Sequence, residues 1–480
     1  MRTDTLKMQV HVRYKVIRIS ILLLAGILVA TPADGAIRRL RRMVVVGDSV
    51  LAGFSSGGFI AHGNGGQVDS APAFVARRAR VGLPQPLMSG PGVPPQLVID
   101  DGNGNGVLDP GEVRRTDDSI GFRARPVRVA RNLAIPGEDM VSVFDEIRPD
   151  VIASRLVDGQ AVEGRDVLKF LELGLPFRSD SVSQLTRARD LRPTFVMVWI
   201  GNNDVLDMAM RTNPDAVTLD ATEFGRRFRR LLDELADTGA DMAVGNLPDV
   251  TGVAALRHAA GEVTSCRQAD GTLRPVATDD LLSIDLERVA LPVPPCTDVL
   301  GPAERDHILK TVSAFNAEIA AAITETEQNR GVRIAPVDLF ALFGGLRANG
   351  LDINGDGAVD ISTGYLGGLF SLDGVHPTPT GNALIANAFL DAIEQRFGDA
   401  IPRVDVARVA ARDRLVGNPF RPAGEAPFGL IGPDDTNVFQ GFFDDVFDRV
   451  SRGAREFASD VRDLGRNFAD RIKRFFRHLF

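Results

Sequence analysis

The sequence has no surplus of positive charge. Its 55 basic side chains are outnumbered by 63 acidic ones, which gives a net charge of −8. Because nucleic-acid backbones attract basic surfaces, we expect no nucleic-acid partner. The shares of hydrophobic residues (44%) and of charged residues (25%) are close to the averages for globular proteins. This composition excludes a wholly disordered, a collagen-like and a multi-span membrane protein.

Cysteine is scarce, and Cys266 and Cys296 are the only two such residues in the chain. A zinc site would need further ligands at suitable spacing, and none stands nearby in the sequence. If the chain is exported to an oxidising compartment, a disulfide between the two cysteines is the default expectation. Two free, buried thiols are the alternative.

The N-terminal region has an apolar run too short to cross a membrane. Basic residues precede the apolar stretch 21–30, and the small residues Ala33, Gly35 and Ala36 follow it. This order is typical of a secretory signal peptide, whereas a membrane span needs about 20 apolar residues. We therefore predict that residues 1–36 are a signal peptide and that the mature protein is secreted or periplasmic. An uncleaved anchor is the alternative.

Short β-branched runs alternate with amphipathic stretches along the chain. This alternation predicts a parallel sheet with helices on both faces, that is, an α/β fold of the three-layer α/β/α type. In such sheets, ligands bind beyond the carboxyl ends of the strands. The predicted strands are 43–46, 127–130, 194–200, 241–245 and 332–336, and the clearest amphipathic stretches are 221–236 and 305–327.

A serine follows the first predicted strand directly, in the sequence Gly47-Asp48-Ser49-Val50. A serine at this place lies at the carboxyl edge of the sheet and at the start of the next helix. Helix starts leave backbone N–H groups unpaired, and these groups stabilise a developing oxyanion. Ser49 is therefore a candidate nucleophile with its own N–H as an oxyanion donor.

Further polar segments follow two other predicted strands. The segment 132–137 ends in Gly137, which can bring its N–H close to a substrate because it has no Cβ. The segment 201–204 has the sequence GNND, and Asn203 can offer a side-chain amide as a third oxyanion donor.

The segment Asp373-Gly374-Val375-His376-Pro377 supplies the remaining chemistry. A serine nucleophile needs an imidazole base near neutral pH, and that base needs a carboxylate to fix its tautomer. The short loop lets Asp373 turn back onto Nδ1 of His376, which leaves Nε2 for Ser49.

These four segments, GDSV, NLAIPG, GNND and DGVHP, stand in the order found in the GDSL (SGNH) family of serine hydrolases, which the chain resembles over about residues 43–400. Only Val50 departs from the first motif, where the family has leucine, and this is a conservative apolar change. The resemblance implies a flavodoxin-like hydrolase domain over residues 37–400.

The resemblance also implies a mechanism, with Ser49 as nucleophile, His376 as base and Asp373 as the residue that orients it. The oxyanion hole would consist of the Ser49 N–H, Gly137 and Asn203, and the reaction would be hydrolysis of carboxylic esters of the esterase or lipase type, through an acyl-enzyme and without a catalytic cofactor. A small-molecule or lipid ester is the expected substrate. A carbohydrate O-deacetylase and a phospholipase are alternatives within the family, and a calcium-dependent surface-binding protein that lost turnover is the alternative outside enzymes.

Two acidic loops have the spacing of calcium sites. The loop 101–112 fits the full pattern of alternating oxygen ligands, a glycine at Gly106 and a final bidentate acid. The loop 352–363 repeats the spacing but has Thr363 in place of that acid. We expect a structural Ca²⁺ in the first loop and leave the second open. The predicted ligands are Asp101, Asn103, Asn105, Val107, Asp109 and Glu112 in the first loop, and Asp352, Asn354, Asp356, Ala358 and Asp360 in the second.

The C-terminal region divides into two parts. Residues 401–435 are rich in Pro, Gly and Arg, which indicates a linker or a chain draped on the surface. In residues 436–480, apolar side chains recur every three or four positions, which predicts a long amphipathic helix. Its phenylalanines and arginines suit contact with a membrane surface. Packing on its own domain or on a second copy is the alternative.

Overall fold

The computed structural model describes residues 38–417, except for residues 107, 110, 116–120, 159, 176–178, 211–218, 260–262 and 284–292. The predicted signal peptide and the predicted helix at 436–480 lie outside the described residues, so both stay predictions. None of the helices in the described part of the chain is long and apolar enough to cross a membrane.

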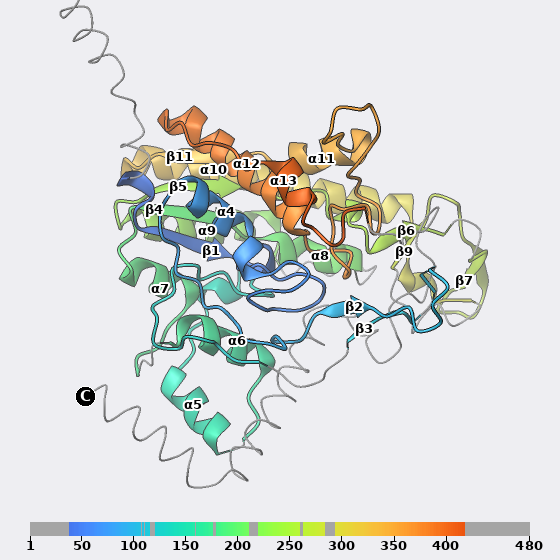
Figure 1. The fold of residues 1–480 in the computed structure, drawn as a ribbon, viewed down its shortest axis with the longest axis horizontal. Helices are drawn as coiled ribbons and strands as arrows, with labels where there is room; N and C mark the ends of the chain where they lie inside the picture. Colours follow the sequence, from blue (N-terminus) through green and yellow to red (C-terminus); the bar gives the residue numbers. More distant parts are fainter. Residues whose placement is uncertain are drawn as a thin grey trace, which may run out of the picture.

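A parallel sheet forms the centre of the molecule, in the strand order β1-β4-β5-β11 (Figure 1). The strands β1 and β4 are buried along their whole length, which explains why both read as continuous apolar runs. Because all four strands are parallel, their carboxyl ends share one edge of the sheet. The bounds of the strands are β1 Met43–Gly47, β4 Phe195–Trp199, β5 Asp241–Gly245 and β11 Ile334–Val337.

The strand predicted at 127–130 is wrong. Val127 and Val129 are 53% and 41% exposed, and no described strand contains them. Strand-like pairing instead begins at Arg131, whose carbonyl accepts the Val45 N–H, while the Leu133 N–H donates to the Val45 carbonyl. The buried side chain of Leu133 gives this later segment an apolar face, which the alternation of Val and Arg at 127–129 cannot provide against a central strand. The chain therefore runs beside β1 directly before Gly137.

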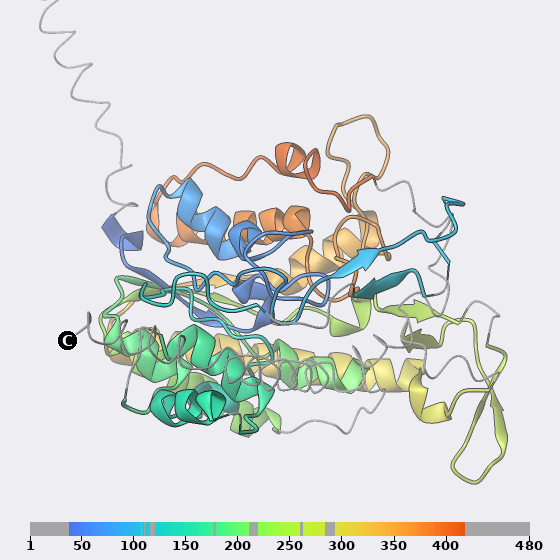
Figure 2. The same cartoon turned by 60° about the horizontal axis from the view of Figure 1, so that its bottom comes forward.

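Helices cover both faces of the sheet, which confirms the predicted three-layer arrangement (Figures 1 and 2). The helices predicted at 221–236 and 305–327 are both present. The second is longer than predicted, since it spans Pro302–Arg330 and ends at its capping glycine, Gly331. One layer holds α4 Ala71–Arg78, α11 Leu339–Asn349, α12 Pro379–Phe397 and α13 Val406–Ala410. The other holds α5 Pro149–Val157, α6 Gly164–Leu173, α7 Gln184–Asp190, α8 Asn202–Met210, α9 Ala221–Ala236 and α10 Pro302–Arg330.

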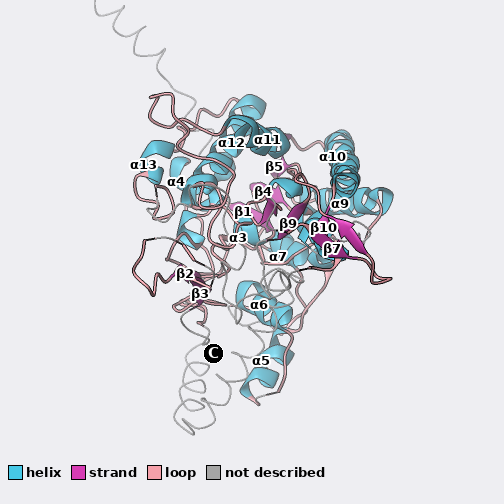
Figure 3. Cartoon of the chain, turned by 90° about the vertical axis from the view of Figure 1, so that its right-hand side faces the viewer, coloured by secondary structure: helices cyan, strands magenta, loops and turns pink. Residues whose placement is uncertain are grey.

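A small antiparallel β insert follows β5, and Figure 3 shows its strands grouped away from the β2–β3 hairpin. The predicted disulfide between Cys266 and Cys296 is confirmed, and it joins β7 to the turn that precedes β10. The insert strands are β6 Leu256–His258, β7 Ser265–Arg267, β8 Leu273–Pro275, β9 Leu281–Ser283 and β10 Val299–Leu300, and the hairpin strands are β2 Leu97–Ile99 and β3 Val113–Arg115.

The predicted linker at 401–435 is wrong in its described part. Ile401, Val404 and Leu415 are buried in the main hydrophobic core, and α13 lies between the latter two. Asp413 accepts hydrogen bonds from the backbone N–H and the hydroxyl of Thr380, at 3.0 and 2.8 Å. These apolar residues are too widely and irregularly spaced to show a periodicity in a Pro- and Arg-rich sequence. The packed domain therefore continues to about residue 417.

Candidate active site

Ser49 lies where β1 passes into the short helix α3 (Ser49–Ala52) at the carboxyl edge of the sheet. The Asp48 side chain caps this helix by accepting the Val50 N–H at 3.0 Å. Gly47 allows the close approach of β1 to β4 here, because a Cβ at this position would stand 2.5 Å from the Trp199 carbonyl oxygen. The local sequence thus fixes the position of the serine hydroxyl from both sides.

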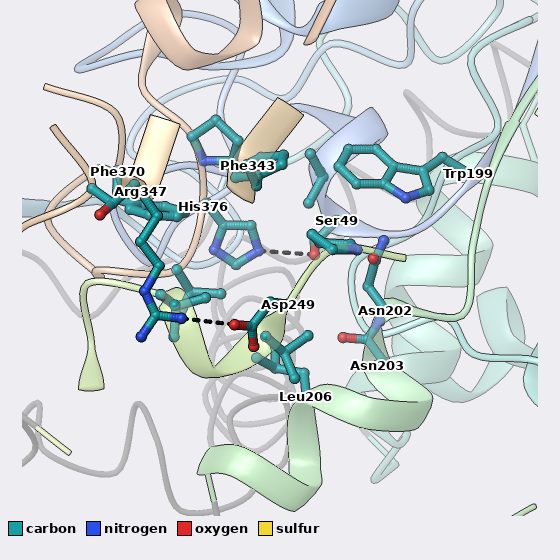
Figure 4. A pocket seen from close by; sticks show the side chains of 18 of the residues that line it. Ser49, Trp199, Asn202, Asn203, Leu206, Asp249, Phe343, Arg347, Phe370 and His376 are labelled. Carbon is teal, nitrogen blue, oxygen red and sulfur yellow. Dashed lines mark hydrogen bonds and ion pairs between the residues drawn. The ribbon is translucent and has the colours of Figure 1, made fainter. Parts of the chain in front are cut away.

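Two hydrogen bonds connect Ser49, His376 and Asp373 in one line. The Ser49 Oγ lies 2.8 Å from Nε2 of His376, and Nδ1 of His376 lies 3.0 Å from Oδ2 of Asp373 (Figure 4 shows the first contact). The imidazole also packs against the ring of Phe54, with 4.7 Å between the ring centroids. The three side chains, which come from the two ends of the domain, are therefore arranged as nucleophile, base and orienting acid.

The Asp373 carboxylate is completely buried and is held by several donors besides the imidazole. Its Oδ1 accepts the backbone N–H groups of Val375 and His376 at 2.9 and 2.8 Å. Its Oδ2 accepts the Gly57 N–H at 2.6 Å, and Ser371 donates its hydroxyl to Oδ1 at 3.2 Å. Neither Gly57 nor Ser371 belongs to a recognisable motif, so their roles could not be predicted from the sequence.

These donors decide the charge of Asp373. Burial by itself would raise the pKa of this carboxyl group, but the neighbouring His376 and the hydrogen bonds outweigh burial and hold its pKa below the usual value. The lowered pKa favours the ionised form of Asp373. An ionised Asp373 holds a proton on Nδ1 of His376 and leaves Nε2 as the acceptor for the serine proton.

The loop that carries Gly137 is tied to the start of α8 by two hydrogen bonds. The Asn203 side-chain amide donates to the Glu138 carbonyl oxygen at 2.7 Å, and the Met140 N–H donates to the Asp204 carboxylate at 3.0 Å. Gly137 has a φ of +79°, a conformation that favours glycine. Asn203 still has its second amide hydrogen for a substrate, and it lines the same pocket as Ser49.

Asp48 and Asn202 form a second polar link across the sheet edge. The Asn202 amide donates to the Asp48 carboxylate at 2.7 Å, which joins the start of α3 to the start of α8. Burial raises the pKa of Asp48 to about 6, although the hydrogen bonds from Asn202 and Val50 oppose this shift. The link fixes the spacing between Ser49 and the residue that follows Asn202, the predicted oxyanion donor Asn203.

A pocket opens beside Ser49 and His376 and is mostly apolar (Figure 4). Asn202 and Asn203 lie on one side of the pocket. On the other side, Arg347 of α11 donates to the Asp249 carboxylate at 2.7 Å. This ion pair joins two walls of the pocket. The apolar lining consists of Val50, Trp199, Leu206, Pro248, Val250, Val253, Phe343, Phe370, Val375 and Pro377.

The first predicted calcium loop, between β2 and β3, brings its described polar residues together. The Asp101 carboxylate accepts the N–H groups of Asn105 and Gly106, and the side-chain amides of Asn103 and Asn105 donate to Asp109. The side-chain amide of Asn103 and the Asp109 N–H also donate to Glu112. Val107 lies outside the described residues.

In the second loop, Asp352 accepts the N–H groups of Gly355 and Gly357, and Asp360 accepts those of Ile353 and Asn354. Asp356 accepts the N–H groups of Ala358 in the same way. In the part of the chain that the structure describes, no group of three or more His, Cys, Asp or Glu side chains is arranged to hold a metal ion. Calcium binding by either loop stays a prediction.

Comparison with known proteins gives a family match and a weak structural likeness. The sequence model of the GDSL-like lipase/acylhydrolase family matches residues 43–389, which include all four motifs. A solved protein from Slackia heliotrinireducens, provisionally classed as an SGNH hydrolase, is 12% identical, with 73% of this chain and 98% of that chain covered and a TM-score of 0.26. A similarity this weak indicates nothing about function. No curated protein matches the chain significantly.

If the loop 101–112 binds Ca²⁺, added calcium should raise the thermal unfolding midpoint and EDTA should lower it, because a ligand that binds only the folded state stabilises it. Differential scanning fluorimetry measures this. Asp101→Asn with Glu112→Gln should remove the shift, and Asp356→Asn in the second loop tests whether that loop contributes. Equal midpoints of the unsubstituted protein in calcium and in EDTA would contradict binding at both loops.

Proposed function

The chain belongs to the GDSL-like lipase/acylhydrolase family, and from this premise we propose that it hydrolyses carboxylic esters through an acyl-enzyme on Ser49. The single observation that carries the proposal is the 2.8 Å contact between the Ser49 hydroxyl and Nε2 of His376, whose Nδ1 is held by Asp373. No other arrangement of side chains in the described pocket activates a nucleophile in this way.

The reaction proceeds in two halves. The Ser49 oxygen attacks the ester carbonyl carbon while Nε2 of His376 takes the hydroxyl proton. The tetrahedral intermediate then collapses, and His376 gives that proton to the departing alcohol. Water attacks the acyl-enzyme in the second half, with His376 again as base and then as acid, so that the carboxylic acid leaves and Ser49 is restored.

The negative charge of each tetrahedral intermediate falls on the former carbonyl oxygen. We assign its stabilisation to the Ser49 N–H, the Gly137 N–H and the Asn203 amide. Such donors act strongly because they are already in place before the reaction and lie in a dry environment, and the loss of one typically costs about 3 kcal/mol of transition-state stabilisation. The hydrogen bond from Asn203 to the Glu138 carbonyl supports this assignment, because it orients the amide beside the loop of Gly137.

The apolar lining of the pocket supports a substrate with an apolar acyl or alcohol group. Aromatic side chains such as Phe343 and Phe370 bury hydrocarbon but offer little to the hydroxyl groups of a sugar. We therefore favour a lipase- or esterase-type substrate over the ester of an acetylated carbohydrate. A phospholipid remains an alternative within the same chemistry, and a calcium-dependent surface-binding protein without turnover is the alternative outside enzymes.

We also propose that the enzyme acts outside the cytoplasm, in the periplasm or the extracellular space. The order of basic, apolar and small residues in positions 1–36 supports this, as does the disulfide between Cys266 and Cys296. Disulfides persist in oxidising compartments and are rare in the cytosol. A membrane-surface contact through residues 436–480 would place a lipid ester near the pocket, and it stays part of the proposal.

The Ser49→Ala variant should lose hydrolysis of p-nitrophenyl butyrate, because no other side chain in the site can form the acyl-enzyme. Asp373→Asn should lower kcat by about 10⁴-fold, since an uncharged amide no longer selects the required tautomer of His376. Both variants should give the circular dichroism spectrum of the unsubstituted protein. Undiminished turnover by a folded Ser49→Ala variant would refute the proposal.

A series of p-nitrophenyl esters should show a higher kcat/KM for butyrate and hexanoate than for acetate, because each added methylene that is buried contributes about 0.8 kcal/mol. Phe343→Ala should reduce this preference, since Phe343 lines the pocket. Phe340→Ala is the matched control, because Phe340 lies one turn earlier on α11, is 41% exposed and is not part of the pocket. A preference for acetate and for acetylated sugars would instead favour the O-deacetylase.

A further inference from the structure

We propose that the buried ion pair between Lys169 and Glu138 is a positioning device for the oxyanion hole, which keeps the Gly137 N–H and the Asn203 amide in the geometry that stabilises the transition state. Lys169 and Glu138 are therefore positioning residues, and neither touches the substrate. This inference rests on the proposed esterase function.

The two charges lie in the interior of the domain. The Lys169 ammonium, on α6, stands 3.3 Å from Oε1 of Glu138, and the two residues are 1% and 0% exposed. No other described residue donates a hydrogen bond to either carboxylate oxygen of Glu138. The attraction of Lys169, with a smaller contribution from Arg165, thus compensates the Glu138 charge for its loss of water.

A buried pair of this kind is not explained by stability. Taking two charges out of water costs several kcal/mol per ion, and well-packed apolar side chains in the same place are often as stable or more stable. Burial raises the pKa of Glu138 to about 7, even though the charge of Lys169 opposes the shift. The location of the ion pair therefore indicates its role better than its contribution to the stability of the fold does.

The ion pair is next to the proposed oxyanion hole in the chain. Glu138 follows Gly137 directly in the chain, and its backbone carbonyl is the acceptor that orients Asn203 at 2.7 Å. Glu138 is therefore linked to both proposed oxyanion donors other than the Ser49 N–H. It is joined to Gly137 through the chain and to Asn203 through this hydrogen bond. A rotation of the Glu138 peptide would turn the Gly137 segment and release the Asn203 amide in a single movement.

Lys169 restrains this movement over a longer stretch of the loop. Besides Glu138, its ammonium donates to the Ser142 carbonyl at 2.6 Å and to the Asp145 carbonyl at 3.2 Å. One cation thus gathers three acceptors within residues 138–145 and ties them to α6. The hydrogen bond from Met140 to Asp204 ties the middle of the same stretch to α8. Residues 137–145, the oxyanion loop, are therefore held by contacts with both α6 and α8.

The test uses Lys169→Met, which keeps an unbranched side chain only one atom shorter and removes the cation. We expect kcat for p-nitrophenyl butyrate to fall by about 10- to 100-fold, because small displacements of catalytic groups cost this much, with KM within about twofold of its original value. The inhibition constant of a trifluoromethyl ketone, whose adduct with Ser49 carries an oxyanion, should rise by the same factor as kcat falls. A purely structural role would not link these two quantities.

The second variant removes both charges, as Lys169→Met with Glu138→Gln. It leaves no unpaired charge in the interior, so it should fold even if the single variant does not. It should show the same losses in kcat and in ketone affinity. Rates are expressed per site reactive with a fluorophosphonate, so that misfolded protein does not count.

Glu172→Gln is the matched control. Glu172 lies one turn after Lys169 on α6, is also fully buried, and has Arg123 as its electrostatic partner. This variant should keep kcat and ketone affinity, whatever its thermal midpoint. Unchanged kcat and ketone affinity in the double variant would overturn the inference while the esterase function stands. An inactive unsubstituted protein that does not bind the ketone would instead reject the proposed function itself.

Discussion

The hydrogen bond between the Ser49 hydroxyl and His376 Nε2 is the interaction on which the rest of the site depends. It joins a residue after the first strand to one just before α12, 327 positions later in the chain. The parallel sheet makes this meeting possible, because all its strands end at the same edge. The donors around Asp373 then fix the carboxylate, which fixes the ring, and the ring fixes the direction of the serine proton.

Part of the site follows from the sequence, because the segments that hold Ser49 and Asn203 each stand directly after a buried apolar strand. The carboxyl end of a parallel strand has one location in the fold, so the positions of Ser49 and Asn203 relative to the sheet can be deduced without coordinates. The turn of Asp373 onto His376 follows from three residues of loop. The disulfide is the default expectation for the only two cysteines of a chain whose N-terminal region predicts export.

Other features could not be read, because they depend on contacts between distant segments. Nothing near Gly57 in sequence indicates that its N–H holds Asp373, and Lys169 and Glu138 belong to no motif and lie 31 positions apart. The misplaced strand at 127–130 has the same cause. β-branched composition indicates a strand, but only burial against β1 decides which residues form it.

The most direct measurement of the central claim is peptide mapping by mass spectrometry after reaction with a fluorophosphonate, which modifies only serines activated by a neighbouring base. The account predicts one adduct, on Ser49, and its loss in His376→Ala at the same reagent concentration. Absence of an adduct on Ser49 in the folded protein, or equal modification without His376, would show that the hydroxyl and the imidazole do not act together.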